Sequence, residues 1–354
     1  MWFLKGIIMK TNILEHKLLL FSILLCLIVS FNGCSNDDDF YASIPDERFE
    51  LALIKLGIDS DGLNGKVAKA DIFEVTSLNI ERAGITDLSG IEGFTSLTIL
   101  YCGQNPITRL NLSQNKALKE LYFSGTQITT LDLRKHPSLE YLYGEANPLI
   151  NLDVSNCPSL ENLRVGNNQL TSLVVSNCPS LKYISCHVNQ LTSLDLSNTA
   201  SLEWLWCYYN QLTSLDVSDN TSLTNLWCSR NQLTSLDVSN NTSLESLRVG
   251  GNKLISLDVS NNIYLRYLGF VLGFLNQHGN NLTSIDISNN LYLEQLDCSD
   301  NDLTSLDVSN NISLISLGCQ SNPLTCIKVN QSQLDNFTQD WGKDPEDYYS
   351  LDCN

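Results

Sequence analysis

Signatures of catalysis and metal binding are missing from this chain of 354 residues. It holds no HExxH pair, no GxSxG turn and no phosphate-binding P-loop, and no two cysteines are spaced as CxxC. Histidine is rare, and we expect His136 at a corner, His187 on an exposed strand face and His278 in an insertion. The chain is therefore predicted not to be an enzyme and to use no cofactor or metal.

Basic residues are also scarce. The 21 lysines and arginines face 39 acidic residues, which gives a formal net charge of −18 at pH 7. A surface of this charge does not attract nucleic acid or anionic lipid. Strong acidity with few aromatic residues is typical of disordered chains, but the regular spacing of the leucines described below excludes that interpretation.

The N-terminal apolar run is too short to span a membrane as an ordinary helix. It extends from Leu18 to Val29, follows Lys10 and Lys17, and is succeeded by Gly33-Cys34. A spanning helix needs about 20 apolar residues. A basic stretch, a short apolar run and a small residue before the cysteine indicate a secretory signal. Residues 1–33 are predicted to be this signal, which also contains Cys26.

The middle of the chain repeats itself every 21 residues. Leu191, Leu212, Leu233 and Leu254 begin successive blocks that match almost letter for letter. Self-similarity at a fixed short period is typical of a solenoid, in which one coil cannot bury its apolar side alone and neighbours must stack. Within a block, apolar and other residues alternate as in a strand with one buried face.

Each coil is predicted to have two short extended sides and two tight corners. An asparagine recurs at one corner, where its amide can pair turn backbone that a narrow coil leaves unpaired. Thr126 and Ala83 replace it in two coils, which gives twelve coils over residues 75–325. The recurring residues are Asn105, Asn147, Asn168, Asn189, Asn210, Asn231, Asn252, Asn280, Asn301 and Asn322.

One interval between these asparagines is seven residues longer than the period. The extra residues lie near 271–277 and are rich in leucine and phenylalanine. Insertions in solenoids form loops on one face, often the binding face. A loop that folds back onto the edge of its coil is the alternative.

The repeat resembles a known family. From Leu202 the block reads L-E-W-L-W-C-Y-Y-N-Q-L, which resembles the leucine-rich repeat L-x-x-L-x-L-x-x-N-x-L. Gly33-Cys34 resembles a lipoprotein cleavage site, and Ser35-Asn36-Asp37-Asp38-Asp39 resembles the acidic tether of Bacteroidetes surface lipoproteins. The whole chain is similar to internalin-like bacterial adhesins.

This resemblance implies a location and a function. Cys34 would carry a lipid that anchors the protein in the outer membrane, exposed at the cell surface. The function would be protein recognition or adhesion without catalysis. Capture of a glycan by a surface lipoprotein is the alternative, because repeat scaffolds of one fold bind many partners.

Residues on either side of the solenoid are predicted to cover its apolar ends. Residues 34–43 form the tether, and 44–74 form a small cap whose helix starts at Pro45-Asp46-Glu47. Asp59 and Asp61 within that cap weakly resemble a calcium loop, although a turn explains them as well. Residues 326–354 are predicted to be an irregular closing cap.

The ten cysteines that follow Cys34 fall into three groups. Cys157 and Cys178 occupy equivalent corners, and Cys326 and Cys353 bracket the closing cap, where we predict a disulfide because an exported protein can form one. The remaining six repeat at one inward slot, where they act as small apolar residues. These are Cys102, Cys186, Cys207, Cys228, Cys298 and Cys319.

A column of aspartates is expected on the second extended side, with Val174 interrupting it. Solvation and hydrogen bonds from nearby serines can offset the repulsion between stacked carboxylates. Calcium bridging would need more oxygen ligands than one column supplies. The column consists of Asp132, Asp153, Asp195, Asp216, Asp237, Asp258, Asp286 and Asp307.

Aromatic residues and arginines are concentrated on the outward face of the first extended side. Exposed rings cost hydrophobic free energy, and Trp, Tyr and Arg dominate binding hot spots, so this face is predicted to bind the ligand. The protein is predicted to be a monomer. The alternative is that the stacked rings only stabilise the sheet. The predicted residues are Tyr101, Tyr122, Tyr141, Tyr143, Arg164, Tyr183, His187, Trp204, Trp206, Tyr208, Trp227, Arg248 and Tyr267.

Overall fold

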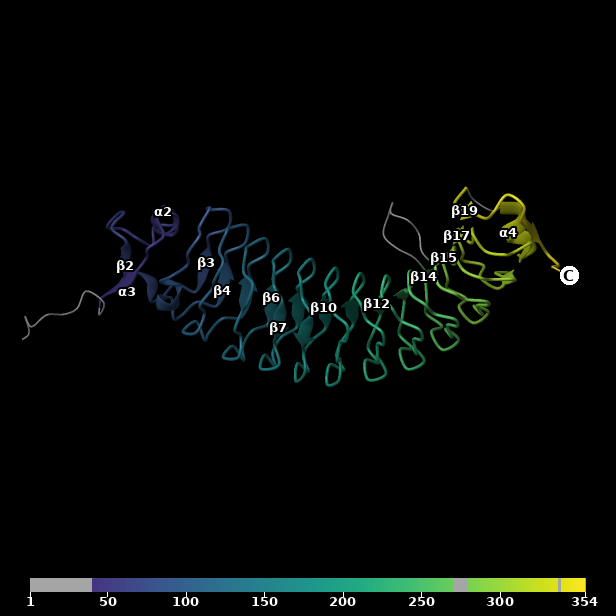
Figure 1. The fold of residues 1–354 in the computed structure, drawn as a ribbon, viewed down its shortest axis with the longest axis horizontal. Coiled ribbons are helices and arrows are strands. Elements are labelled where there is room, and N and C mark those ends of the chain that lie inside the picture. Colours follow the sequence, from purple (N-terminus) through teal and green to yellow (C-terminus); the bar gives the residue numbers. More distant parts are fainter. Residues whose placement is uncertain (1–39, 270–278, 337–338, 354) are drawn as a thin grey trace, which may run out of the picture.

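The computed structural model describes residues 40–269, 279–336 and 339–353, which form a curved solenoid of parallel strands. The predicted signal with Cys26 and Cys34, and the predicted insertion 271–277 with His278, lie outside the described residues. Figure 1 shows the coils stacked in an arc, with the longest sheet along its inner side. The predicted solenoid is therefore confirmed. No helix in these ranges is long and apolar enough to cross a membrane.

The inner sheet contains thirteen parallel strands, one from each turn. Sequence periodicity predicted twelve, and the thirteenth, β19, comes from the closing cap. The strands are β3 (Ser77–Asn79), β4 (Ile99–Tyr101), β5 (Glu120–Tyr122), β6 (Tyr141–Tyr143), β8 (Asn162–Arg164), β10 (Tyr183–Ser185), β11 (Trp204–Trp206), β12 (Asn225–Trp227), β13 (Ser246–Arg248), β14 (Tyr267–Gly269), β15 (Gln295–Asp297), β17 (Ser316–Gly318) and β19 (Trp341–Gly342).

Regular pairing on the second side of the coil is less extensive than predicted. The described strands there are β7 (Asn151–Asp153) with β9 (Ser172–Val174), and β16 (Leu306–Asp307) with β18 (Cys326–Lys328) and β20 (Tyr348–Ser350). In most other coils a single backbone bond joins the neighbours, such as the amide of Gln211 donating to the carbonyl of Leu191 at 2.8 Å.

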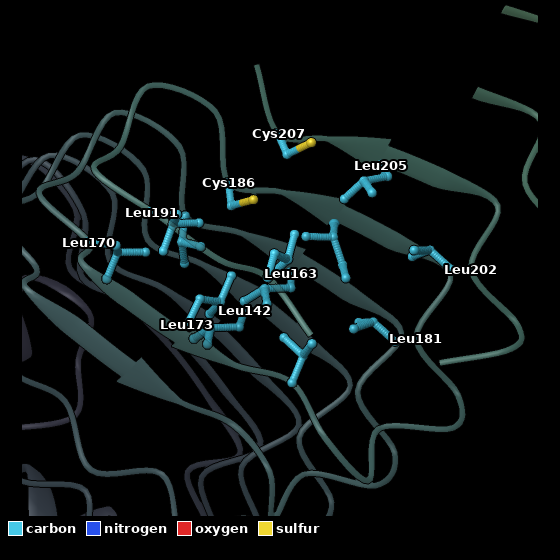
Figure 2. Packing of buried hydrophobic residues seen from close by; sticks show 14 of the residues in the cluster. Leu142, Leu163, Leu170, Leu173, Leu181, Cys186, Leu191, Leu202, Leu205 and Cys207 are labelled. Carbon is cyan, nitrogen blue, oxygen red and sulfur yellow. The ribbon is translucent and has the colours of Figure 1, made fainter. Parts of the chain in front are cut away.

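The core fills the space between the two sides of each coil. Leu202, Leu205 and Cys207 are all fully buried, and their equivalents in neighbouring coils stack in register beside them (Figure 2). Burial raises the pKa of the Cys186 thiol to about 12, so it stays neutral and packs as a small apolar side chain. The predicted inward slot of the cysteines agrees with their burial.

A ladder of buried asparagine side chains runs along one corner, as predicted. The amide nitrogen of Asn210 donates to the carbonyls of Cys186, in the previous coil, and Cys207, at 3.0 and 3.1 Å. Its oxygen accepts from the amide of Leu191 at 3.0 Å. Each such residue therefore satisfies backbone groups of two adjacent coils, where water cannot reach them.

A second polar ladder at the opposite corner is less apparent in the sequence. Asn241 donates to the carbonyls of Val217 and Asn220 at 2.9 and 2.8 Å. Five coils carry other residue types at this position, which hides the pattern. The ladder consists of Asn115, His136, Cys157, Cys178, Thr199, Asn220, Asn241, Asn262, Asn290, Asn311 and Gln333.

The aspartate column on the second side closes turns. Asp216 accepts from the amide of Ser218 at 3.0 Å, and Asp237 accepts likewise from Ser239 at 2.9 Å. Hydrogen bonds from these serines lower the pKa of both aspartates. Among the described residues, no group of three His, Cys, Asp or Glu side chains could hold a metal ion. The turn hydrogen bonds thus give the column a structural role.

The N-terminal cap has two strands and two helices. Strands β1 (Tyr41–Ser43) and β2 (Lys66–Ala68) pair antiparallel, while α2 (Glu47–Lys55) and α3 (Lys69–Ile72) cover the first coil, which carries a short 3₁₀ turn, η2 (Ile91–Gly93). The cap therefore begins earlier than predicted, because β1 falls within the expected tether 34–43.

One aspartate joins this cap to the first coil. Asp46 caps helix α2 by accepting from the amides of Arg48 and Phe49. Its second oxygen accepts from the amide and hydroxyl of Thr86 at 2.8 and 2.7 Å. These hydrogen bonds fix the helix so that Phe49 lies fully buried on the apolar end of the stack.

The weak calcium-loop resemblance has another structural explanation. Glu50 accepts from the amides of Asn64 and Gly65, both at 2.7 Å, and so closes the loop that contains Asp59 and Asp61. Asp59 accepts from the amide of Asp61 at 3.3 Å. Burial raises the pKa of Asp59 to about 6. The segment is a turn that the helix holds in place.

The closing cap is more regular than predicted, because it continues both sides of the solenoid. Strands β19 and β20 extend the two sheets, and α4 (Gln331–Asn336) lies between β18 and β19 in sequence. Gln333 donates to the carbonyls of Val308 and Asn311 at 2.9 and 3.0 Å, as asparagine does in earlier coils. A disulfide joins Cys326 and Cys353, whose Cα atoms lie 5.7 Å apart.

A valine adopts the left-handed conformation that each coil requires before its ladder asparagine. Val188 has φ 50° and is 40% exposed, whereas Asn167 fills the equivalent position in the previous coil. A β-branched residue is strained there, whereas asparagine visits this region readily. We expect Val188→Asn to raise the free energy of unfolding by about 1 kcal/mol, measured by urea denaturation. Val174→Asn, at a similarly exposed valine in strand β9, is the control and should give no gain.

Candidate binding face

The candidate site is the concave surface of the inner sheet. Each strand buries its middle residue and turns its first and third side chains outward, because successive side chains alternate. The parallel register aligns equivalent residues of neighbouring coils, as it does Tyr101, Tyr122 and Tyr143. The thirteen residues predicted from the sequence therefore share one surface. Trp204 is the most open of them, at 37% exposed, and the others are half-buried.

The first half of this surface is a continuous stack of rings. Tyr101 and Tyr122 stack with ring centroids 4.3 Å apart, and Tyr122 and Tyr143 follow at 4.7 Å. The guanidinium of Arg164 then lies between the rings of Tyr143 and Tyr183, at 5.0 and 4.8 Å from their centroids. These separations are close to the strand spacing of about 4.8 Å, so the sheet itself sets the stacking distance.

The stack continues across the middle of the sheet. Tyr183 meets Trp206 edge to face at 5.3 Å, which bridges the coil where Ser185 supplies no ring. Trp206 and Trp227 are nearly parallel at 4.5 Å, and Arg248 covers Trp227 at 4.4 Å. We call the eight residues from Tyr101 to Arg248 the aromatic ladder. It consists of Tyr101, Tyr122, Tyr143, Arg164, Tyr183, Trp206, Trp227 and Arg248.

Stacking decides which part of each ring a partner can touch. Inside the ladder the ring faces contact neighbouring rings or guanidinium groups, so edges and polar atoms remain for solvent. The hydroxyl of Tyr122 donates to Glu120 at 2.8 Å, and burial raises the pKa of Tyr183 to about 12. The phenols therefore stay protonated at neutral pH. The surface presents ring edges, hydroxyls and cations.

His187 belongs to a small polar cluster beside the ladder. Its Nδ1 lies 2.8 Å from the hydroxyl of Ser185, and its Nε2 lies 3.2 Å from the amide nitrogen of Asn167. The ring stacks on Tyr208 at 4.7 Å, and burial lowers the pKa of the imidazole. A Cβ at Gly166 would overlap this ring, so the glycine makes room for it.

This Ser–His pair lacks the access that a nucleophile needs. Ser185 is fully buried beneath the surface, and its hydroxyl bonds only the imidazole among the described residues. His136 is also buried. It lies at a corner of its coil, with Nε2 3.1 Å from the carbonyl oxygen of Leu112. Both histidines have structural neighbours, and neither faces a cleft beside a catalytic partner.

Some of the predicted residues lie outside the ladder, and one exposed ring was missed. Tyr141, Trp204 and Tyr267 occupy the first position of their strands, and Trp204 packs edge to face on Trp206 at 6.4 Å. Tyr209, which follows the predicted Tyr208, is 37% exposed and lies beneath the guanidinium of Arg230 at 4.9 Å. The sequence signal for it is a second aromatic directly before a ladder asparagine.

The face changes character toward the closing cap. After Arg248 the third position of successive strands holds Gly269, Asp297, Gly318 and Gly342, where earlier coils carry rings. A cavity of about 310 Å³ opens there. The sequence signal was the replacement of aromatic residues by glycine at one strand position. Alternation alone predicts which side a residue faces, and it did not reveal the cavity.

Comparison with known proteins identifies the fold. No family model matches the chain. A segment of 86 residues is 34% identical to internalin J of Listeria monocytogenes, and it spans 24% of this chain and only 8% of that protein. The solved functional domain of internalin J, described as including a cysteine ladder, shares 28% identity at a TM-score of 0.56, covering 82% of this chain and 77% of the domain.

Two further solved structures agree. Internalin F of Listeria monocytogenes has a TM-score of 0.70 and 22% identity, covering 88% of this chain and 96% of its own. A leucine-rich-repeat protein of Leptospira interrogans has a TM-score of 0.63 and 25% identity, covering 72% and 69%. The predicted leucine-rich-repeat fold is therefore confirmed.

Proposed function

We propose that this internalin-like leucine-rich-repeat solenoid is a non-enzymatic cell-surface protein that recognises a protein partner through its aromatic ladder. The observation that supports this most is the ladder itself, in which Tyr, Trp and Arg side chains line one concave face. These are the residue types that dominate protein-binding hot spots. The column on the other side of the same coils holds aspartates that close turns, so the rings are not a general property of the repeat.

The stacking favours a protein over a glycan as the ligand of the ladder. Sugar rings bind aromatic residues through the open face of the ring, and in the ladder those faces are already in contact, as between Trp206 and Trp227. The exposed edges, hydroxyls and guanidinium groups suit the mixed polar and apolar surface of a protein. The sheet is also a rigid support, which lowers the entropic cost of binding.

Replacing two tryptophans tests the proposal. A surface partner would first be recovered by affinity capture, and its dissociation constant would then be measured with purified proteins. Trp204→Ala with Trp206→Ala is expected to weaken binding by more than about 2 kcal/mol, because hot-spot rings carry most of the affinity. Tyr264→Ala with Tyr292→Ala is the matched control, since these exposed rings stack 6.3 Å apart at a corner away from the ladder.

Thermal unfolding of the same variants separates binding from stability. If the tryptophans only support the sheet, the double variant would melt much earlier and still bind its partner with unchanged affinity. That outcome would contradict the proposal.

We also propose that Cys34 carries the lipid that anchors the protein at the outer membrane. Support comes from the short apolar run that precedes Gly33-Cys34 and from the acidic stretch that follows. Cys34→Ala is expected to release the protein from the membrane fraction, as judged by cell fractionation and immunoblotting. Ser35→Ala is the matched control and should stay membrane-bound. Retention of Cys34→Ala in the membrane fraction would refute the anchor.

A further inference from the structure

The cavity near the closing cap lies beside two glycines. A Cβ at Gly318 would lie 3.0 Å from Oδ1 of Asp297 and 3.1 Å from the hydroxyl of Ser299. A Cβ at Gly342 would lie against the amide nitrogen of Gln320. The side chains of Asp297, Ser299 and Gln320 therefore already cover the two glycines, and a hollow of about 310 Å³ lies beside them, in a column where most earlier coils carry a ring or an arginine. Such a volume lies at the lower end of the range for small-ligand pockets.

Planar polar groups surround this hollow. Asp297 uses Oδ1 to accept from the amide of Ser299 at 3.0 Å, and the hydroxyl of Ser299 is 3.0 Å from Oε1 of Gln320. These bonds hold the carboxylate and the carboxamide in place beside the cavity. Arg248 forms another wall with its guanidinium drawn over Trp227, toward the ladder and away from Gly269. Hydrogen-bond donors and acceptors therefore line the same space.

The lining carries charges of both signs. Arg248 and Asp297 lie on opposite sides of Gly269, two strands apart, and Asp340 adds a second carboxylate to the lining. Desolvation raises the pKa of Asp297, whose hydrogen bonds among the described residues come from Ser299 alone and leave room for further donors. A ligand rich in hydroxyl groups would supply those donors and accept from Arg248 and Gln320 in return.

One aromatic wall differs from the ladder. Tyr267 lines the cavity, and its hydroxyl lies 3.4 Å from Glu294. Its neighbours in the same column are Ser246 and Gln295, so its ring is not stacked on another ring among the described residues. A flat ring without an aromatic neighbour beside planar hydrogen-bonding groups suits a pyranose, which has apolar CH surfaces and polar edges.

We propose that this cavity binds one unit of a neutral saccharide through Asp297, Gln320 and Arg248, with Tyr267 against the sugar ring. The site shares Arg248 with the end of the aromatic ladder, but its other residues lie beyond the ladder, and it does not depend on the proposed protein partner. A single sugar unit offers few atoms for contact, so we expect an affinity on the order of millimolar for a monosaccharide. A longer glycan would continue along the open sheet.

Ligand-observed NMR with the full chain tests this site. The probes are the methyl glycosides of glucose, galactose, mannose and N-acetylglucosamine, with butylammonium as a cationic probe. We expect saturable binding of at least one glycoside and a loss of roughly ten-fold or more in Asp297→Ala, because a charged hydrogen-bond partner is removed. Gly318→Val should also abolish binding, because its Cβ would lie 3.0 Å from Oδ1 of Asp297 and would displace that carboxylate from the wall of the cavity.

Control variants keep the result interpretable. Tyr264→Ala with Tyr292→Ala, at the corner that precedes strands β14 and β15 and outside the lining of the cavity, should bind the glycoside as the wild type does. If Asp297→Ala or Gly318→Val lowers the melting temperature strongly, Gln320→Ala is measured instead of that variant. The side chain of Gln320 is half-buried, accepts from the hydroxyl of Ser299 and lies beside Gly342. Failure of every glycoside to saturate, unchanged binding by the variants, or saturation by butylammonium alone would overturn the proposal.

Discussion

Replacing Asn210 with alanine is expected to lower the free energy of unfolding by about 3 kcal/mol, although the side chain touches no ligand. The substitution leaves the buried amide of Leu191 without its partner. The carbonyls of Cys186 and Cys207 each lose one of two bonds and keep those from Asn189 and Asn231. Asn210 is only 7% exposed, so water does not replace the lost bonds. A buried polar group without a partner costs about 1–3 kcal/mol of stability, which is more than the loss of a single weak contact would cost.

Urea denaturation followed by circular dichroism measures this effect. Gln211→Ala is the matched control, because the next residue is exposed at the same corner and uses only its backbone in the coil contact. Its expected change is within about 0.5 kcal/mol. A loss below about 1 kcal/mol for Asn210→Ala would show that the corner relaxes and pairs its backbone in another way.

Removing the disulfide of the closing cap is expected to destabilise that cap by about 3 kcal/mol. Cys326 and Cys353 are 27 residues apart in sequence, and cross-linking them limits the freedom of the unfolded segment. Since coils contact only their neighbours, the loss should appear as early unfolding of the last turns rather than of the whole stack. Hydrogen exchange should therefore rise first around strands β18 and β20 in Cys326→Ser with Cys353→Ser.

Alkylation of the native protein provides the control. Cysteines such as Cys186 and Cys207 are buried and unpaired, so they should react only after unfolding, whatever the state of the cap. Cys326 and Cys353 should resist alkylation even in denaturant until a reductant is added. Two free thiols at these positions in the native protein, read by mass spectrometry, would contradict the assignment.

The repeat made most of the fold predictable. A fixed period of 21 residues aligned Leu202, Leu205 and Cys207 with their equivalents, and all of these are buried. The asparagine corner was equally clear, since only a side chain with both a donor and an acceptor can serve two coils. The repeats give many examples of the same local structure within one chain, so the pattern can be recognised without a homologous sequence.

The features that escaped prediction are those that break the repeat. The second corner ladder holds His136, Cys157, Cys178 and Thr199 among its asparagines, so no single residue type marked it. Strand β19 comes from a segment that had dropped the period. A coil at the end of a stack meets solvent on one side, so its sequence must cover the apolar end of the stack and departs from the repeat.

The position of the candidate face was predictable, but the stacking of its rings and the cavity beside them were not. Alternation put Trp206 and Trp227 on the outward side, where the structure has them. Their face-to-face contact at 4.5 Å depends on register and rotamers, which alternation alone does not give. The glycine column that opens the cavity at Gly318 depends likewise on the absence of side chains in neighbouring strands, a property of the stack rather than of one coil.

The near-identity of the coils between Leu191 and Asn252 has a genetic consequence. Asn210, Asn231 and Asn252 make the same bonds to the coil before them, so each boundary between coils is chemically interchangeable with the next. Unequal recombination between these blocks would delete or duplicate a whole coil and rejoin surfaces that already fit. The gene can therefore lengthen or shorten the concave sheet by one strand at a time without inventing a new interface.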